Sequence, residues 1–352
     1  MDIVTVKKAV ILAAGAGKRL DPITATRPKH LIPIAGKPIL QYTIEYLKTI
    51  GISDILLVVG YKKEQIQEYF QDGGDFGVSI SYIEQKQYLG TSHATKLAKS
   101  FVSDDTFLLL YGDLLMDSQV FQQIQHLAKS EENIILCKEV TDPDNFGVVV
   151  CDKNQYVQKI VEKPADDTYG NLVNAGVYLF SPKIFDAIKN TKKSERKEYE
   201  LTDTIEIFLE MGQKLRVLNI SANFWNDVGR PWDILTANQY FLDKLSTEIK
   251  GTVEEGVHIK GVVIVGNNTV IKSGTYIEGP VLIGENCTIG PNAYIRPYTS
   301  LGNKVKIGNS SEIKNTVVFS HTHISHLSYV GDSIIGENVN LDNSNINLNS
   351  YD

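Results

Sequence analysis

A strict six-residue period governs the C-terminal third of the chain. An aliphatic or aromatic residue stands at every sixth position: Val253, Ile259, Val265, Ile271, Ile277, Ile283, Ile289, Ile295, Leu301, Ile307, Ile313 and Phe319. Hexapeptide periods of this kind are typical of a parallel β-helix, in which each short strand turns one apolar side chain inward. Because three strands complete one coil, these positions predict about four coils.

The period is expected to slip after Phe319 and to resume at Tyr329, with about four extra residues near 320–326. Segments that interrupt a solenoid are favoured places for function. The interruption contains His321, His323 and His326, but no carboxylate lies close in sequence, so we do not expect a metal site there.

A different pattern governs residues 1–240. Apolar runs of strand length, such as 54–61 and 78–83, alternate with amphipathic helical stretches such as 39–50. This alternation predicts a mostly parallel sheet flanked by helices, with ligands at the carboxyl ends of its strands. With 352 residues, the chain is long enough for two domains, expected at 1–240 and 250–352.

The first apolar run, residues 9–13, leads directly into a glycine loop at Gly15 and Gly17. Glycines after a buried strand let backbone N–H groups approach a phosphate chain closely. Arg19 and Lys29 follow and would add positive charge beside those phosphates.

Two well-known phosphate loops are excluded. A Walker loop requires a glycine where Leu12 stands and Ser or Thr where Arg19 stands. A dinucleotide fingerprint requires a small residue at the position of Leu20. On the glycines alone, a flexible turn with two surface cations is the simpler interpretation.

The composition limits the kinds of binding partner that the chain is expected to have. The formal net charge of −7 argues against a nucleic-acid surface. The three cysteines have no C-x-x-C spacing, which fits a reducing cytoplasm rather than a disulfide framework or zinc site. We find neither the layout of a signal peptide nor an apolar stretch long enough to span a bilayer, so no membrane partner is expected.

The full N-terminal pattern is more specific than its glycines. L-A-A-G-x-G-x-R-L, then T-R-P-K, then L-I-P-I-A-G-K-P resembles the signature of the sugar-1-phosphate nucleotidyltransferases. The resemblance implies a Rossmann-like domain that binds a nucleoside triphosphate and a sugar 1-phosphate. Arg19 would hold the leaving pyrophosphate and Lys29 the α-phosphate, and the loop around the triphosphate would comprise Leu12, Ala13, Ala14, Gly15 and Gly17.

A second segment indicates which branch of this family the chain resembles. Residues 85–94 resemble the Q-x-x-x-L-G-T-x-H-A segment of N-acetylglucosamine-1-phosphate uridylyltransferases. The resemblance implies that Gln85 and Gly90 read a pyrimidine base and that Thr91 lies near base or sugar. Thr91 would also serve as a helix cap, and we expect His93 to be structural rather than an acid or base. UTP and dTTP both remain open.

Two aspartates are candidates for binding Mg²⁺. Asp113 ends the apolar run 106–112, and a carboxylate at a strand end suits Mg²⁺, which accepts few protein ligands. A cap on the next turn is the alternative. Asp227, in W-x-D-x-G, resembles the second metal ligand of the family, which implies that the two aspartates share one ion.

Three further motifs resemble the family's sugar-binding points. Gly147, Glu162 and Asn174 would bind sugar hydroxyls or an N-acetyl group, and Lys163 would hold the sugar phosphate. The segment E-x-x-x-T-D adds Glu198 as a candidate near the sugar, whereas Asp203 is expected in the first turn of a helix.

The C-terminal repeat resembles the left-handed β-helix of hexapeptide acyltransferases, which implies a homotrimer or a multiple of one. Residues 312–314 and 326–332 resemble the acetyltransferase half of bifunctional relatives. There His326 would act as general base while Lys314 and Tyr329 hold the substrate. Relatives continue with a G-A-G-T-I-T-x-N-like run and further coils, whereas this chain has a different run at 342–349 and stops at 352. Acetyl transfer is therefore an alternative, and assembly is the other expected role of the β-helix.

The prediction is an enzyme that transfers a nucleotidyl group from UTP or dTTP to a sugar 1-phosphate, with N-acetylglucosamine 1-phosphate favoured and Mg²⁺ as cofactor. Three alternatives stay open: a glucose-1-phosphate thymidylyltransferase, a bifunctional enzyme with acetyltransferase activity, and a non-catalytic nucleotide-sugar regulatory subunit.

Overall fold

The computed structural model describes residues 6–164 and 167–342, which form two compact units. The first comprises residues 6–31 and 39–227, and the second comprises 32–38 and 228–342. The predicted fold class is confirmed: a Rossmann-like α/β unit precedes a left-handed parallel β-helix. The predicted domain limits stay predictions. No helix of the described residues is long and apolar enough to cross a bilayer.

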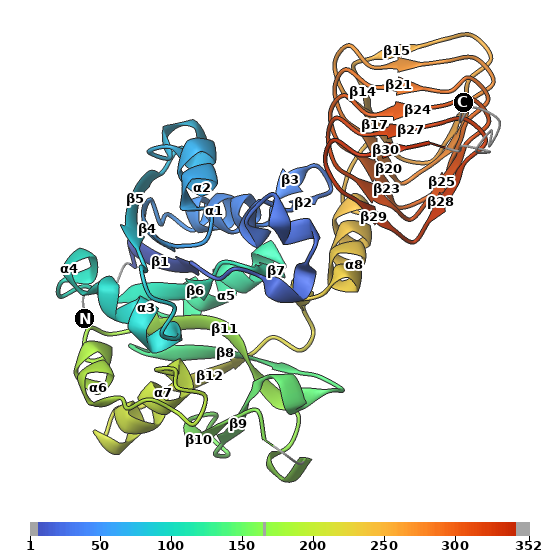
Figure 1. Cartoon of the computed structure of the whole chain (residues 1–352). Coiled ribbons are helices and arrows are strands. Elements are labelled where there is room, and N and C mark those ends of the chain that lie inside the picture. The colour runs from blue at the N-terminus through green and yellow to red at the C-terminus, as the bar shows by residue number, and fades with distance from the viewer. Residues whose placement is uncertain (1–5, 165–166, 343–352) are drawn as a thin grey trace, which may run out of the picture. The chain divides into compact units, whose positions relative to one another are not determined.

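A nine-stranded sheet forms the middle of the first unit (Figure 1). Its path runs β10-β9-β11-β6-β1-β4-β5, with β8 joining β11 to β12. Only β10 and β11 run against the other strands, so the carboxyl ends of most strands meet at one edge. The strands are β1 (Lys8–Ala13), β4 (Asp54–Val59), β5 (Ser79–Glu84), β6 (Phe107–Tyr111), β8 (Ile134–Glu139), β9 (Gly147–Cys151), β10 (Val157–Glu162), β11 (Leu172–Phe180) and β12 (Arg216–Asn219).

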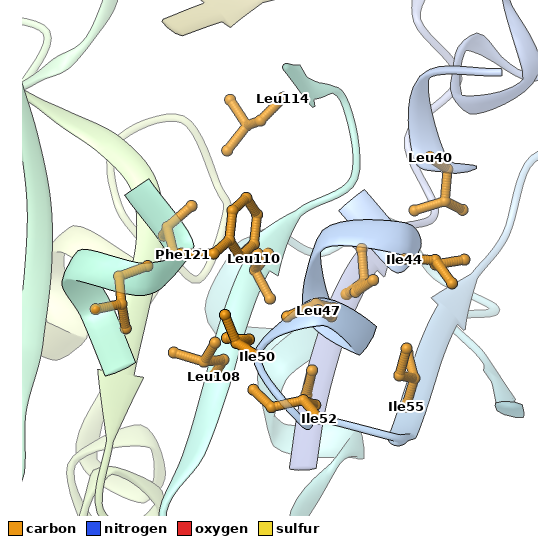
Figure 2. Packing of buried hydrophobic residues seen from close by; sticks show 14 of the residues in the cluster. Leu40, Ile44, Leu47, Ile50, Ile52, Ile55, Leu108, Leu110, Leu114 and Phe121 are labelled. Carbon is orange, nitrogen blue, oxygen red and sulfur yellow. The ribbon is translucent and has the colours of Figure 1, made fainter. Parts of the chain in front are cut away.

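Helices cover both faces of this sheet because its strands are apolar on both sides. Ala9 and Ile11 of β1 belong to one hydrophobic cluster and Val10 and Leu12 to the other. The first cluster packs under α1 (Ile39–Thr49), α2 (Lys63–Phe70) and α5 (Ser118–Leu127). Figure 2 labels Leu47 of α1 and Leu108 and Leu110 of β6 among the side chains of this cluster. The second cluster packs under α3 (Thr91–Leu97), α4 (Lys99–Val102), α6 (Ile184–Asn190) and α7 (Leu201–Glu210).

Short elements complete the two units. In the first, β13 (Trp225–Asp227) pairs antiparallel with β7 (Leu114–Met116). In the second, the hairpin of β2 (Pro33–Ile34) and β3 (Lys37–Pro38) packs with α8 (Pro231–Leu242). The Ala35 N–H donates to Oδ1 of the fully buried Asn238 at 2.9 Å, and Asn238 donates in turn to the Tyr298 carbonyl.

The β-helix has three parallel sheets, two of six strands and one of five. Cross-strand partners stand 18 residues apart in the first coils, as between Ile277 and Ile295. The predicted inward positions from Val265 to Ile313 are buried and form one core, whereas Val253 is 37% exposed. The strands are β14 (Glu248–Ile249), β15 (Thr252–Val253), β16 (His258–Lys260), β17 (Val263–Val265), β18 (Val270–Ile271), β19 (Tyr276–Glu278), β20 (Val281–Ile283), β21 (Thr288–Ile289), β22 (Tyr294–Ile295), β23 (Thr299–Leu301), β24 (Lys306–Ile307), β25 (Glu312–Lys314), β26 (Val317–Val318), β27 (His323–Ile324), β28 (Tyr329–Gly331), β29 (Ile334–Ile335) and β30 (Asn340–Leu341).

The expected interruption near residues 320–326 is wrong. Leu301 pairs with Val318 and Ile307 with Ile324, so the coil is one residue shorter there and carries no insertion. The shortening occurs between β25 and β26, at the corner that contains Asn315. Val318, not Phe319, takes the inward position, and Tyr329 points outward with 63% of its surface exposed. The different run at 343–349 lies outside the described residues.

Candidate active site

One cavity of about 450 Å³ lies at the carboxyl ends of the strands of the first unit. Leu12 pairs with Tyr111 and Val59 with Glu84, so the segments that follow β1, β5 and β6 meet at this edge. The cavity is lined by many of the residues predicted to bind the nucleotide, which are Leu12, Ala14, Gly15, Gly17, Lys29, Gln85, Gly90, Thr91 and Asp113.

The glycine loop allows the Lys29 side chain to enter the cavity. Gly17 has a φ of +67°, which favours glycine. A Cβ at Gly17 would lie 3.2 Å from Cβ of Lys29, so a side chain there would press on the lysine stem. Gly15 is less constrained, because its Cβ would meet Lys29 only at 3.8 Å.

Lys29 and Asp113 form an ion pair inside the cavity. Their side chains are only 16% and 13% exposed, and the ammonium donates a hydrogen bond to Oδ2 of the aspartate. Burial alone would raise the pKa of Asp113, but the charge and hydrogen bond of Lys29 outweigh it and hold that pKa below its usual range. Asp113 therefore stays ionised, and the ion pair holds the Lys29 side chain at the strand ends.

His30 is a cavity residue that the sequence analysis did not identify. It is 1% exposed, it follows Lys29 directly, and its Nδ1 has no hydrogen-bond partner among the described residues. Burial, reinforced by the charge of Lys29, lowers its pKa to about 3, while Asp113 acts in the opposite direction. His30 is therefore neutral at physiological pH.

Another part of the cavity lining is built around Gly90. Its φ is +105°, and a Cβ there would lie 2.5 Å from the Tyr199 carbonyl oxygen. The Tyr199 N–H donates to the Leu89 carbonyl, and Thr91 Oγ1 accepts the Leu201 N–H. Thr91 is thus the first residue of α3 and not its cap, since the cap position is Gly90.

Strand pairing places Asp227 opposite the segment that follows Asp113. Asp227 of β13 stands opposite Leu114 of β7, the residue that follows Asp113. Mg²⁺ takes one or two protein carboxylates together with phosphates and water, so the two aspartates are of the chemical type that could hold it. Within the described residues no cluster of three or more His, Cys, Asp or Glu offers a full set of protein ligands.

The predicted sugar-binding residues gather at β9, β10 and β11. Gly147 and Glu162 stand opposite each other, and a Cβ at Gly147 would lie 3.2 Å from Oε2 of Glu162. Asn174 Nδ2 donates to Tyr178 Oη at 2.5 Å. Lys163 has a φ of +46°, and its N–H donates to the Phe146 carbonyl.

Glu162 belongs to a charged cluster. Burial and the negative charge of Glu200 raise the pKa of Glu162, and Arg196 opposes the shift. Arg196 Nη1 lies 3.5 Å from Oε1 of Glu162, and its Nη2 lies 2.8 Å from Oε1 of Glu200. Arg196 was not identified from sequence, although it lies two residues before the candidate Glu198.

Several predicted residues do not line the cavity. Ala13 is fully buried in the core, and Arg19 is exposed on the short 3-10 turn Lys18–Leu20. Asp227 and the four sugar-binding candidates also lie outside its lining. Tyr111 is a lining residue that the sequence analysis missed; its position just before Gly112-Asp113, at the end of a strand, was the available signal.

Two of the residues predicted for acetyl transfer, Lys314 and Tyr329, lie on one sheet of the β-helix, and the third, His326, lies in the turn before β28. Glu312 pairs with Tyr329 and Lys314 with Gly331, so Lys314 and Tyr329 are on adjacent strands. Lys314 Nζ lies 3.3 Å from Oδ2 of Asp332. His326 is exposed three residues before Tyr329.

A glycine loop and a buried lysine–carboxylate pair lie at the strand ends of a mostly parallel sheet, an arrangement that suits a nucleotide phosphate chain. The chain belongs to the nucleotidyl transferase family, whose model matches residues 8–244. Residues 277–347 match a second model, described as the GMPPB C-terminal domain.

The relatives narrow the class to the sugar-1-phosphate nucleotidyltransferases, and this chain is such an enzyme. It is 46% identical to the bifunctional protein GlmU of Methanocaldococcus jannaschii, over 97% of this chain and 80% of the relative. It is 42% identical to the bifunctional sugar-1-phosphate nucleotidylyltransferase/acetyltransferase of Sulfurisphaera tokodaii, over 95% of this chain and 80% of that relative. A solved UDP-glucose pyrophosphorylase with UDP-glucose is 25% identical, has a TM-score of 0.62, and aligns with 68% of this chain and all of its own.

Proposed function

We propose that the chain transfers the uridylyl group of UTP to N-acetylglucosamine 1-phosphate and releases pyrophosphate. The observation that carries the proposal is that one cavity is lined both by Gly15, Gly17 and Lys29 and by Gln85 and Gly90. The first group of residues suits phosphates and the second suits a base. The resemblance of residues 85–94 to the uridylyltransferase branch and the similarity to proteins named GlmU favour this substrate pair.

In the proposed reaction, a phosphate oxygen of the sugar 1-phosphate attacks the α-phosphorus in line, and the bond to the β-phosphate oxygen breaks. Lys29 neutralises the α-phosphate, and Arg19 holds the departing pyrophosphate. Mg²⁺, held by Asp113 and Asp227, would supply further positive charge to the phosphates. Catalysis then rests on positioning and charge neutralisation rather than on a covalent enzyme intermediate.

The sugar would lie against Gly147, Glu162 and Asn174, with Lys163 on its phosphate. The absence of a side chain at Gly147 leaves room beside the Glu162 carboxylate, which supports a hydroxyl or amide partner at this point.

Pyrophosphate release from the purified chain with Mg²⁺ tests the proposal. UTP, dTTP, GTP, ATP and CTP are each combined with glucose, N-acetylglucosamine and mannose 1-phosphates. We expect the highest kcat/KM for UTP with N-acetylglucosamine 1-phosphate. A preference for dTTP with glucose 1-phosphate would keep the reaction and replace the substrates. Nucleotide binding without turnover in any combination would favour a regulatory subunit.

Acetyl transfer is a second candidate activity. Its support is that Lys314 and Tyr329 stand on neighbouring strands, two positions apart in register, together with the name of the Sulfurisphaera relative. Incubation with acetyl-coenzyme A and glucosamine 1-phosphate should then release free coenzyme A, and His326→Ala should abolish the release. No release from the unmodified chain would leave assembly as the proposed role of the β-helix.

A further inference from the structure

The side chain of Gln85, which lines the nucleotide cavity, is held in one orientation by two partners. Gln85 follows β5, is only 5% exposed, and its backbone N–H donates to the Val59 carbonyl at 2.8 Å. Its side-chain Nε2 donates to the Gly90 carbonyl at 3.1 Å and lies 3.1 Å from His93 Nδ1. Both contacts use the same nitrogen.

These contacts determine which end of the amide faces each neighbour. A carbonyl oxygen can only accept, so the atom beside Gly90 must be the Nε2 donor. The second hydrogen of that nitrogen is left for His93 Nδ1, which must then be the unprotonated acceptor of a neutral ring whose hydrogen is on Nε2. Burial, and secondarily the charge of Lys96, lower the pKa of His93 and favour this neutral ring.

The remaining atom, Oε1, is an acceptor without a competing task. Among the described residues, both hydrogen bonds of the Gln85 side chain use Nε2. A flipped amide would turn Oε1 toward the Gly90 carbonyl, which also accepts, and would keep its hydrogen bond with His93 only if that ring moved its hydrogen to Nδ1. The flip would therefore replace the hydrogen bond to Gly90 by a contact between two acceptors, and a buried polar group without a partner is costly.

We propose that His93 is a positioning residue that fixes the Gln85 amide with its acceptor available to the nucleobase, so that the cavity selects a base with an N–H on its pairing edge. The inference rests on the proposed function, because it requires Gln85 to face the base. Uracil and thymine carry this N–H at N3, whereas the N3 of cytosine is itself an acceptor. In a cytosine base, the N3 acceptor would face the Oε1 acceptor of Gln85 with no hydrogen between them, so the cavity would reject cytosine.

The test measures kcat/KM for the better of UTP and dTTP, and for CTP, with the sugar 1-phosphate held constant in the full chain. The ratio of the two values reports discrimination. Loss of one neutral hydrogen bond in His93→Ala should lower the ratio by about 5- to 10-fold, mainly through the KM of the preferred nucleotide. His93→Asn, whose amide oxygen can accept from Gln85, should restore the ratio to within about twofold of the unmodified chain.

Lys99→Ala is the matched control. Lys99 and His93 both line a second cavity of about 840 Å³, and neither Lys99 nor its helix α4 contributes to the nucleotide cavity. Its ratio should not change. If His93→Ala slows both nucleotides by the same factor, His93 only supports the fold and the inference is overturned. Competitive inhibition constants for CTP give the same ratio where turnover is too slow to measure.

Gln85→Ala separates this inference from the proposed function. If the ratio collapses in Gln85→Ala but not in His93→Ala, Gln85 faces the base while the positioning role of His93 is wrong. If Gln85→Ala leaves the ratio unchanged, the proposed base contact itself is wrong, whatever His93 does.

Discussion

Gly90 shows how closely one residue can be constrained by its surroundings. Its φ is +105°, and a Cβ at this position would come within 2.5 Å of the Tyr199 carbonyl oxygen. We expect Gly90→Ala to lower the free energy of unfolding by about 2 kcal/mol or more, since both backbone strain and a clash with backbone result. Gly212→Ala is the control, because Gly212 has a φ of +78° but meets nothing within 4 Å. Urea denaturation should show the smaller loss for Gly212→Ala, and equal losses would mean that the Tyr199 contact does not matter.

Lys29 carries the clearest prediction for catalysis. Lys29→Ala removes the cation that is paired with Asp113 and leaves that carboxylate buried without its partner. Turnover should fall on the order of 10²-fold or more, the loss typical of a preorganised electrostatic group. Lys153→Ala, at an exposed turn of the same unit, removes an equal charge and should leave the rate unchanged. An unchanged kcat in Lys29→Ala would rule out its proposed role.

Glu162 gives the expected pH dependence. The pKa of Glu162 is raised in the folded protein. Between the pKa of the unfolded chain and this raised pKa, the folded state binds more protons than the unfolded state. The free energy of unfolding therefore falls as the pH rises through the raised pKa. Glu162→Gln removes this titration and should be the more stable protein at neutral pH, with a weaker fall between acid and neutral pH. Denaturation curves at several pH values measure this dependence of the free energy of unfolding on pH. Glu195→Gln, at an exposed position, is the control. A steeper fall in Glu162→Gln would contradict the sign of the shift.

At the level of single residues, the phosphate side of the site was predictable and the surrounding residues were not. Lys29 and Asp113 follow recognisable loop and strand patterns in the sequence. Because the carboxyl ends of parallel strands meet at one edge of a sheet, their place in one cavity could be predicted. His30 and Tyr111 line the same cavity. Tyr111 was marked only by its place at the end of a strand, and His30 is distinguished from an ordinary core residue only by the three-dimensional packing.

Among the elements, the β-helix strands make the most regular prediction. Ile295 is fully buried in a column with Ile277 and Ile313. Ile295→Ala should destabilise the coils by about 2–5 kcal/mol, the usual loss for a large aliphatic side chain in a packed core. Val253→Ala, at the 37% exposed end of the solenoid, should cost far less. Hydrogen exchange of the coils at increasing urea measures the two variants, and similar protection in both would contradict the column.

The same elements show the limit of a periodic pattern. Val317, Val318 and Phe319 are consecutive apolar residues, and a fixed period of six selects Phe319. Strand pairing instead aligns Val318 with Leu301, because the corner before β26 is one residue shorter. A pattern in the sequence can therefore locate the coils, but hydrogen-bonded register decides which of several neighbouring apolar residues points inward.

For the whole molecule, we predict a homotrimer or a multiple of one, as the resemblance of the β-helix to the acyltransferase solenoids implies. Sedimentation equilibrium should give at least three times the 39.2 kDa of the chain. A mass of one or two chains would contradict the prediction. Measurement at several concentrations separates a stable trimer from weak association.

The seven residues 32–38 set a condition on how this protein can be taken apart. They follow the Lys29 segment directly in the chain, yet they belong to the second compact unit, where Ala35 donates to Asn238. The β-helix unit is therefore not a contiguous cassette. A fragment that begins at residue 228 would lack one of its own pieces, and an exchange of solenoids between relatives must carry this hairpin along with the coils. Modularity here follows packing and not the linear order of the chain.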